Sequence, residues 1–244
     1  MRLDVYLYEN ALCASRTESK GFIVDGAVTV NGKVVKKPSC EVNEGDVIDV
    51  DKSGKRFVSR GGLKLEGALD AFGIDPSGRI ALDVGASSGG FTDCLLKRGA
   101  STIIAVDSGT GQLVEALRND ERVVSIEGYN ARYMEPSHLP AVPSLAVMDV
   151  SFISATYIIP AVYSCLSEQA DFICLIKPQF EVGRAHIGKG GVVKDEVYRK
   201  MAVDKVTDFA AFSGFVTVSV IESPIKGGDG NIEYLAHFRK GETA

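Results

Sequence analysis

The spacing of hydrophobic residues changes several times in the first part of the chain. Apolar residues recur at helical spacing over 2–12, and Ser15, with a glutamate three positions later, is the capping-box signal for a second helix. The pattern then alternates on both sides of Asn31-Gly32, a dipeptide that favours a tight β-hairpin, and a further strand follows at 47–50. These short elements predict a small α+β domain.

From Phe57 onward, short apolar strands alternate with helical segments. The predicted strands are 79–84, 102–107, 123–126, 145–150, 172–176, 217–221 and 234–239. The predicted helices are 92–97, 113–118, 155–168 and 196–213. Such alternation predicts an α/β fold, a Rossmann-like and mostly parallel sheet with helices on both faces.

The boundary between the two patterns is polar. The run 51–55 contains no apolar residue and is typical of a linker. We therefore assign residues 1–55 to the small domain, 56–62 to a connecting segment and 63–244 to the larger domain.

Composition and charge exclude several classes of protein. The 45% hydrophobic and 24% charged residues are globular values, and a net charge of −5 argues against a general nucleic-acid coat. Five scattered cysteines and three histidines, with no CxxC pair, predict neither a disulfide framework nor a metal site. No signal-peptide pattern and no apolar run of about 18 residues are present, so we expect a cytoplasmic protein without a membrane segment. The oligomeric state stays open.

A glycine-rich run follows the first predicted strand of the larger domain. It reads Asp83-Val84-Gly85-Ala86-Ser87-Ser88-Gly89-Gly90-Phe91, and glycines at such a turn let the backbone approach a ligand closely. Asp107 ends the next strand, where a carboxylate can accept hydrogen bonds from ribose hydroxyls. The acidic Asp83, and a serine in place of the middle glycine of the dinucleotide motif, favour S-adenosylmethionine over NAD and over a simple tight turn.

The candidate cofactor residues are Asp83, Gly85, Ser87, Gly89, Gly90, Phe91, Asp107 and Asn130. Asn130 follows a predicted strand near the expected adenine position, although a capped loop explains this residue equally well.

Four charged residues form the candidate catalytic set: Lys64, Asp149, Lys177 and Glu233. Asp149 and Lys177 each follow an apolar strand, where the carboxyl edge of an α/β sheet binds ligands. A lysine in apolar surroundings is unfavourable unless it is paired or functional, and a neutral lysine can act as a general base. Each residue alone is more often a solvated strand end or a structural ion pair. Together, beside a cofactor site, they favour group transfer to a hydroxyl.

With these motifs the chain resembles the TlyA family, whose members are known both as haemolysin-like proteins and as ribosomal RNA 2′-O-methyltransferases. The match covers nearly the whole chain, including 26–32 and 56–62, although the family often has Trp where this chain has Phe57. The resemblance implies an FtsJ-like methyltransferase domain that uses S-adenosylmethionine and no metal. It also implies that Lys177 takes the proton from a ribose 2′-hydroxyl, that Asp149 and Lys64 assist, and that Glu233 orients Lys64 or the hydroxyl.

The same resemblance implies an RNA-binding fold for the small domain and ribosomal RNA or ribosomal subunits as partners. The candidate RNA contacts are Arg2, Arg16, Lys20, Lys33, Lys36, Lys37 and Arg60. We expect Asp4, Glu9 and Asp25 on another side of the domain. From the charges alone an ordinary mixed surface is the better interpretation, and the resemblance reverses that preference.

Three other functions stay as alternatives. An RNA-binding protein with a non-catalytic methyltransferase scaffold is disfavoured by the complete catalytic set. A membrane-active haemolysin is disfavoured because the chain shows no amphipathic membrane helix. A NAD-linked oxidoreductase is disfavoured by the pattern of the glycine run.

Overall fold

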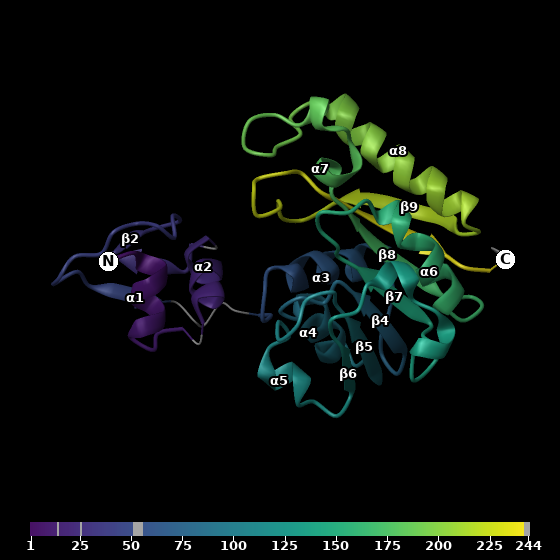
Figure 1. The fold of residues 1–244 in the computed structure, drawn as a ribbon, viewed down its shortest axis with the longest axis horizontal. Helices are drawn as coiled ribbons and strands as arrows, with labels where there is room; N and C mark the ends of the chain where they lie inside the picture. The colour runs from purple at the N-terminus through teal and green to yellow at the C-terminus, as the bar shows by residue number, and fades with distance from the viewer. Residues whose placement is uncertain (14, 25, 51–55, 242–244) are drawn as a thin grey trace. The chain divides into compact units, whose positions relative to one another are not determined.

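The computed structural model describes residues 1–13, 15–24, 26–50 and 56–241. They belong to two compact units, Met1–Ser59 and Arg60–Ala244 (Figure 1). The run 51–55, which the sequence predicts to be a linker, lies outside the described residues.

The small unit packs two helices against a three-stranded antiparallel sheet in the order β2-β1-β3. Its elements are α1 (Leu3–Glu9), α2 (Arg16–Val24), β1 (Val28–Val30), β2 (Lys33–Val34) and β3 (Ile48–Val50). Asn31 and Gly32 have φ angles of 52° and 75°, so the hairpin turn is the predicted one. Leu3, Leu7 and Ile23 are fully buried in its core.

The larger unit is built on a seven-stranded sheet in the order β6-β5-β4-β7-β8-β10-β9. The strands are β4 (Ile80–Val84), β5 (Thr102–Val106), β6 (Val123–Ile126), β7 (Leu145–Met148), β8 (Asp171–Ile176), β9 (Val216–Glu222) and β10 (Tyr234–Arg239). β10 runs antiparallel to both of its neighbours, and the other pairs are parallel, which confirms the predicted fold class. Strand order reverses between β4 and β7, and ligands bind at the carboxyl ends of the strands at such a point.

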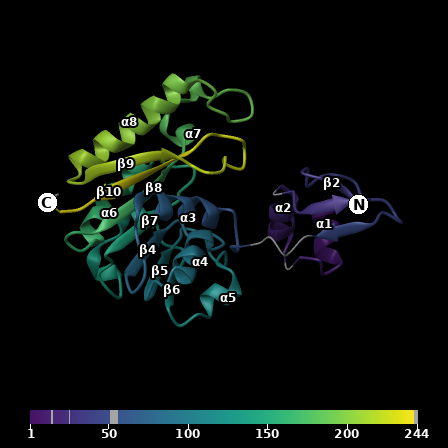
Figure 2. The ribbon, with the colours of Figure 1, turned by 180° about the vertical axis from the view of Figure 1, so that it is seen from behind.

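Helices cover both faces of this sheet. They are α3 (Gly61–Phe72), α4 (Gly90–Lys97), α5 (Glu115–Arg118), α6 (Ile159–Cys165), α7 (Pro178–Glu181) and α8 (Glu196–Phe212). Short 3₁₀ turns are η1 (Ala131–Tyr133), η2 (Pro136–His138), η3 (Ala155–Tyr157) and η4 (Arg184–His186). α6 lies on the nearer side of the sheet in Figure 1, and α3 and α4 lie on the other side, which Figure 2 shows from behind.

The sequence prediction is wrong about three helices, one of which is the four-residue α7, which it did not predict. α3 was not predicted, although it is twelve residues long and carries Lys64. The single helix predicted over 155–168 is instead the turn η3 followed by α6. Pro160 lies in the first turn of α6, and because proline has no N–H to donate, it begins a new helix there.

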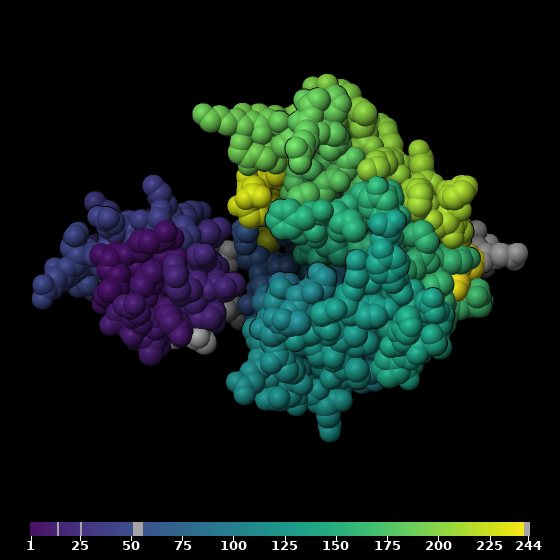
Figure 3. All heavy atoms as spheres, viewed as in Figure 1, coloured from purple at the N-terminus to yellow at the C-terminus, as the bar shows by residue number. Residues whose placement is uncertain are grey.

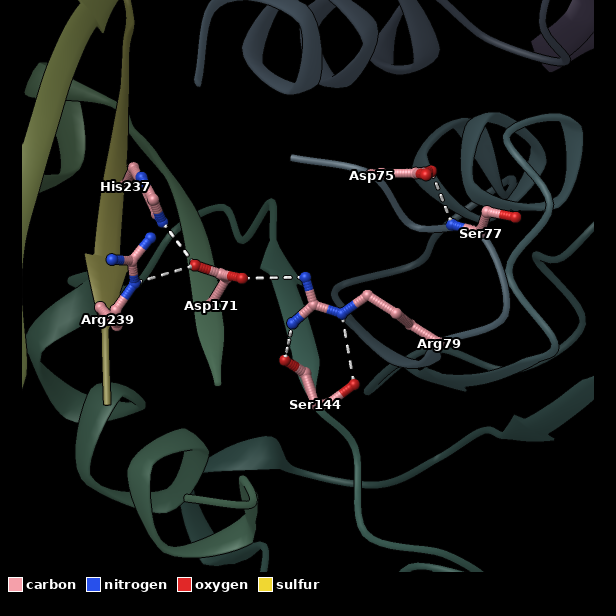
Figure 4. Close-up of polar contacts among 7 residues, drawn as sticks. All are labelled: Asp75, Ser77, Arg79, Ser144, Asp171, His237 and Arg239. Atoms are coloured by element: carbon pink, nitrogen blue, oxygen red, sulfur yellow. Dashed lines mark hydrogen bonds and ion pairs between the residues drawn. The ribbon is translucent and has the colours of Figure 1, made fainter. Parts of the chain in front are cut away.

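A polar network ties four strands together at the edge of the sheet opposite the carboxyl ends of the parallel strands (Figure 4). Arg79 Nη1 lies 2.8 Å from Asp171 Oδ2, and the same guanidinium donates to the carbonyl and hydroxyl oxygens of Ser144. His237 Nε2 lies 2.8 Å from Asp171 Oδ1. Burial would raise the pKa of Asp171, but these contacts outweigh it and lower that pKa to about 2.

Candidate active site

Lys177 and Asp149 form an ion pair at the carboxyl edge of the sheet. Asp149 follows β7, Lys177 follows β8, and Lys177 Nζ lies 2.5 Å from Asp149 Oδ1. The same ammonium donates a hydrogen bond of 2.7 Å to the hydroxyl of Ser151. The lysine side chain is 11% exposed and the aspartate 23%, so both are largely buried and still partly accessible.

Lys64 and Glu233 form a second, more deeply buried pair. Lys64 Nζ, on α3, lies 2.5 Å from Glu233 Oε2, and the side chains are 9% and 3% exposed. Gly227 lies against this carboxylate so closely that a Cβ there would collide with Glu233 Oε1. The fully buried Asn231 supports the same loop, because its amide accepts a hydrogen bond from the Val193 N–H.

Strand register brings the two pairs to the same edge. Tyr234 of β10 pairs with Ile176 of β8 in antiparallel register, so the residues next to them, Glu233 and Lys177, lie at one end of these strands. In Figure 3 the surface of the larger unit is hollowed below the yellow loop that precedes β10. Two lysines and two carboxylates, far apart in the sequence, thus border one edge of the sheet.

The glycine-rich run forms a cradle between β4 and α4. Gly85 has a φ of 86°, and a Cβ at this position would collide with the Asp149 carbonyl oxygen. Gly89 has a φ of 98°, and a Cβ there would collide with the Leu117 side chain. Gly90 begins α4 and Phe91 is buried beneath it. Only glycine fits the two crowded positions, and the backbone therefore lies open to a ligand.

Asp107 closes the side of this cradle. Its carboxylate accepts hydrogen bonds from the backbone N–H groups of Ser87, at 2.8 Å, and Gly109, at 2.7 Å. Each carboxylate oxygen has further acceptor capacity, which suits vicinal ribose hydroxyls. Asn130 accepts a hydrogen bond from the Arg132 N–H and caps η1, which is the alternative that the sequence left open for this residue.

Asp83 is the residue of the glycine-rich run that most clearly indicates a bound ligand. It is fully buried, and its Oδ2 accepts a 2.6 Å hydrogen bond from the Thr92 hydroxyl. Its Oδ1 has no hydrogen-bond partner among the residues that the structure describes. Burial raises the pKa of this carboxyl to about 7. A buried oxygen of this kind fits a cationic donor such as the ammonium group of S-adenosylmethionine, so the residues present fit that cofactor.

The candidate RNA residues are exposed or partly exposed. Lys20, Lys33, Lys36 and Lys37 are exposed on the small unit, while Arg60, partly exposed, precedes α3 in the larger one. The expectation that Asp4 lies on another side is wrong. Asp4 is fully buried between Arg2, at 2.8 Å, and Arg16, at 3.3 Å, because a buried carboxylate needs cationic partners. Asp25 lies outside the described residues.

Phe152 is a candidate that the sequence reasoning missed. Its side chain is 91% exposed, and its φ of 64° is unusual for a bulky residue. The ring centroid lies 5.2 Å from that of Phe180, three residues after Lys177. In the sequence it reads as the continuation of an apolar strand, and only the backbone conformation turns it outward.

Comparisons with known proteins identify the family of each unit. A family model for FtsJ-like methyltransferases matches residues 57–240, and one for the S4 domain matches residues 1–48. The chain is 45% identical to Hemolysin A of Brachyspira hyodysenteriae over 239 residues, 98% of this chain and 99% of that one. It is 43% identical, over 98% of its length and 89% of the relative's, to the 16S/23S rRNA (cytidine-2′-O)-methyltransferase TlyA of Mycobacterium tuberculosis.

A solved structure from Streptococcus thermophilus, provisionally described as a hemolysin, matches with a TM-score of 0.80 and 43% identity. The match covers 100% of this chain and 89% of that one. Within the described ranges, no helix combines the length and the apolar character that crossing a bilayer requires.

Proposed function

The chain belongs to the TlyA family of FtsJ-like methyltransferases, and from this membership we propose that it methylates a ribose 2′-hydroxyl of ribosomal RNA with S-adenosylmethionine as the donor. The observation that carries the proposal is the Lys177–Asp149 pair, 2.5 Å apart at the sheet edge where the glycine cradle also ends. A ribosomal substrate agrees with the cytoplasmic location expected from the sequence.

The cradle residues would hold the cofactor. Asp83 Oδ1 would accept a hydrogen bond from its ammonium group, Asp107 would accept from its ribose hydroxyls, and the backbone at Gly85 and Gly89 would lie against it. When bound, S-adenosylmethionine supplies an electrophilic methyl group on a sulfonium centre.

Lys177 is suited to remove the proton from the acceptor. Its Nζ, in the neutral form, takes the proton of the 2′-hydroxyl, and the O–H electron pair stays on the ribose oxygen. Asp149 and Ser151 fix the position of Nζ at 2.5 Å and 2.7 Å and stabilise the ammonium that forms. Much of the rate would come from this positioning and from the charges already in place.

Lys64 is suited to hold the acceptor ribose. The Lys64 ammonium can donate three hydrogen bonds. Glu233, 3% exposed, accepts one of them, and the others can be donated to a substrate oxygen. The exposed ring of Phe152 offers a surface on which the base of the same nucleotide can stack. The lysines of the small unit, with Arg2 and Arg16, supply phosphate contacts.

Methyl transfer to purified ribosomal subunits and to free ribosomal RNA tests the proposal. Labelled S-adenosylmethionine is the donor, and the product nucleotide is identified after digestion, with 2′-O-methylcytidine sought first because the Mycobacterium tuberculosis relative's name specifies cytidine. Lys177→Ala should abolish transfer and keep cofactor binding, whereas Lys200→Ala, at a 74% exposed lysine, should leave both transfer and cofactor binding unchanged. Transfer by Lys177→Ala at the wild-type rate, or methylation of a base instead of the ribose, would contradict the proposal.

A further inference from the structure

Two segments of the active site lie side by side and are joined by three contacts in register. One segment follows β7 and runs from Asp149 to Ala155, and the other follows β8 and runs from Lys177 to Glu181. At the first contact, Lys177 binds Asp149 and Ser151. At the second, the ring of Phe180 meets that of Phe152 at 5.2 Å between centroids.

Glu181 makes the third contact. Its Oε2 accepts a 2.5 Å hydrogen bond from the Ser154 hydroxyl, and its Oε1 accepts a 2.7 Å bond from the Ala155 N–H. Lys205 of α8 lies 2.9 Å from Oε2 and also donates to Ser154 Oγ at 3.2 Å. The glutamate side chain is 2% exposed, so the carboxylate is directed wholly at this segment and at the lysine.

The segment after β7 is therefore fastened at both ends. At its start the Asp149 N–H donates to the Val84 carbonyl oxygen, and at its end Glu181 holds Ala155. Between these points Phe152 keeps a φ of 64° with its ring in solvent. A bulky residue in that region is strained, and such strain persists only where the surrounding structure over-determines the backbone.

We propose that Glu181 is a positioning residue for the methyl transfer, because it holds the segment that places Ser151 against Lys177 and Phe152 toward the substrate. This inference rests on the proposed function. Glu181 is bonded to Ser154, Ala155 and Lys205 and not to the catalytic pair, so it acts through the positions of Ser151 and Phe152. Without its carboxylate the far end of the segment is released, Phe152 relaxes to negative φ, and Ser151 withdraws from Nζ.

Steady-state kinetics on ribosomal subunits test the proposal. Glu181→Ala should lower kcat by about 10- to 100-fold, the range expected when reacting groups shift by about 1 Å. Its dissociation constant for S-adenosylmethionine, from calorimetry without RNA, should stay within about twofold because the cradle is untouched. Glu181→Gln keeps an acceptor for the Ala155 N–H and should restore kcat to within about threefold of wild type.

Asp171→Asn is the matched control, since Asp171 is also a paired and largely buried carboxylate but lies at the opposite edge of the sheet. It should lose stability and keep kcat. An unchanged kcat in Glu181→Ala, an equal loss of kcat in Asp171→Asn, or no recovery in Glu181→Gln would overturn the proposal.

If Glu181→Ala does not fold, Ser154→Ala is the deciding variant. A lower kcat at unchanged KM would support the proposal, and a wild-type kcat would contradict it. A wild type that transfers no methyl group defeats the proposed function itself, whereas an active wild type with an equally active Glu181→Ala removes only this inference.

Discussion

Asp171→Asn should destabilise the larger unit by an amount that can be worked from the structure. In the wild type, the guanidinium of Arg79 and the imidazole of His237 each lie 2.8 Å from one carboxylate oxygen of Asp171, and this side chain is 16% exposed. Its pKa falls from the ordinary 3.8 to about 2, and this gap corresponds to about 2–3 kcal/mol of unfolding free energy at pH 7. Because the folded-state pKa is depressed, the contribution is complete above about pH 4 and disappears as pH falls toward 2.

Urea unfolding followed by far-ultraviolet circular dichroism measures this effect. At pH 7 the transition of the larger unit should move down by about 1 M urea, for a slope of 2–3 kcal/mol per M. At pH 3 the difference between wild type and variant should shrink to about half. Asp75→Asn is the control on the same edge (Figure 4), because the exposed Asp75 accepts a turn hydrogen bond from Ser77 that asparagine also accepts.

Two results would contradict this prediction for Asp171. The first is that Asp171→Asn and Asp75→Asn have the same unfolding free energy at pH 7, within about 0.5 kcal/mol. Alternatively, the difference between Asp171→Asn and wild type would grow, not shrink, as the pH falls. Either result would mean that the network gives no net stabilisation through the charge of Asp171.

Three further predictions concern the cofactor cradle and the small unit. Gly85→Ala should weaken binding of S-adenosylmethionine at least about tenfold in calorimetry, because a Cβ there meets backbone, whereas Gly78→Ala, at a similar φ but in open space, should not. The ligand-free protein should lose unfolding free energy as pH rises from about 4 to 7, since folded Asp83 keeps a proton up to a pKa of about 7, and Asp83→Asn should flatten this slope in urea titrations. Asp4→Asn should weaken binding to ribosomal RNA several-fold in filter-binding assays although it removes a negative charge, because Arg2 and Arg16 lose the carboxylate that orients them. Tighter binding would show that charge alone matters.

Elements with a strong local cause could be predicted from the sequence. Asn31-Gly32 turns a hairpin because few residues accept a positive φ at both positions. β10 was predicted over its observed residues, and β8 to within one residue, because buried strands are short apolar runs. α3 was missed because it opens with glycines and mixes charges into its buried face, where Lys64 and Glu66 lie.

The sequence by itself determined which side chains end strands and where glycines interrupt them, since both follow from the chemistry of neighbouring residues. It named Lys64, Asp149, Lys177 and Glu233 and offered Lys64 as one of two partners for Glu233, but it did not fix their pairing, since Lys64 and Glu233 are separated by 169 positions. Their pairing, the burial of Asp4 between two arginines, and the clamp that Glu181 closes on the segment after β7 depend on strand order and register. Those are set by packing of the whole unit, because contacts between distant segments form only when every layer between them is in place.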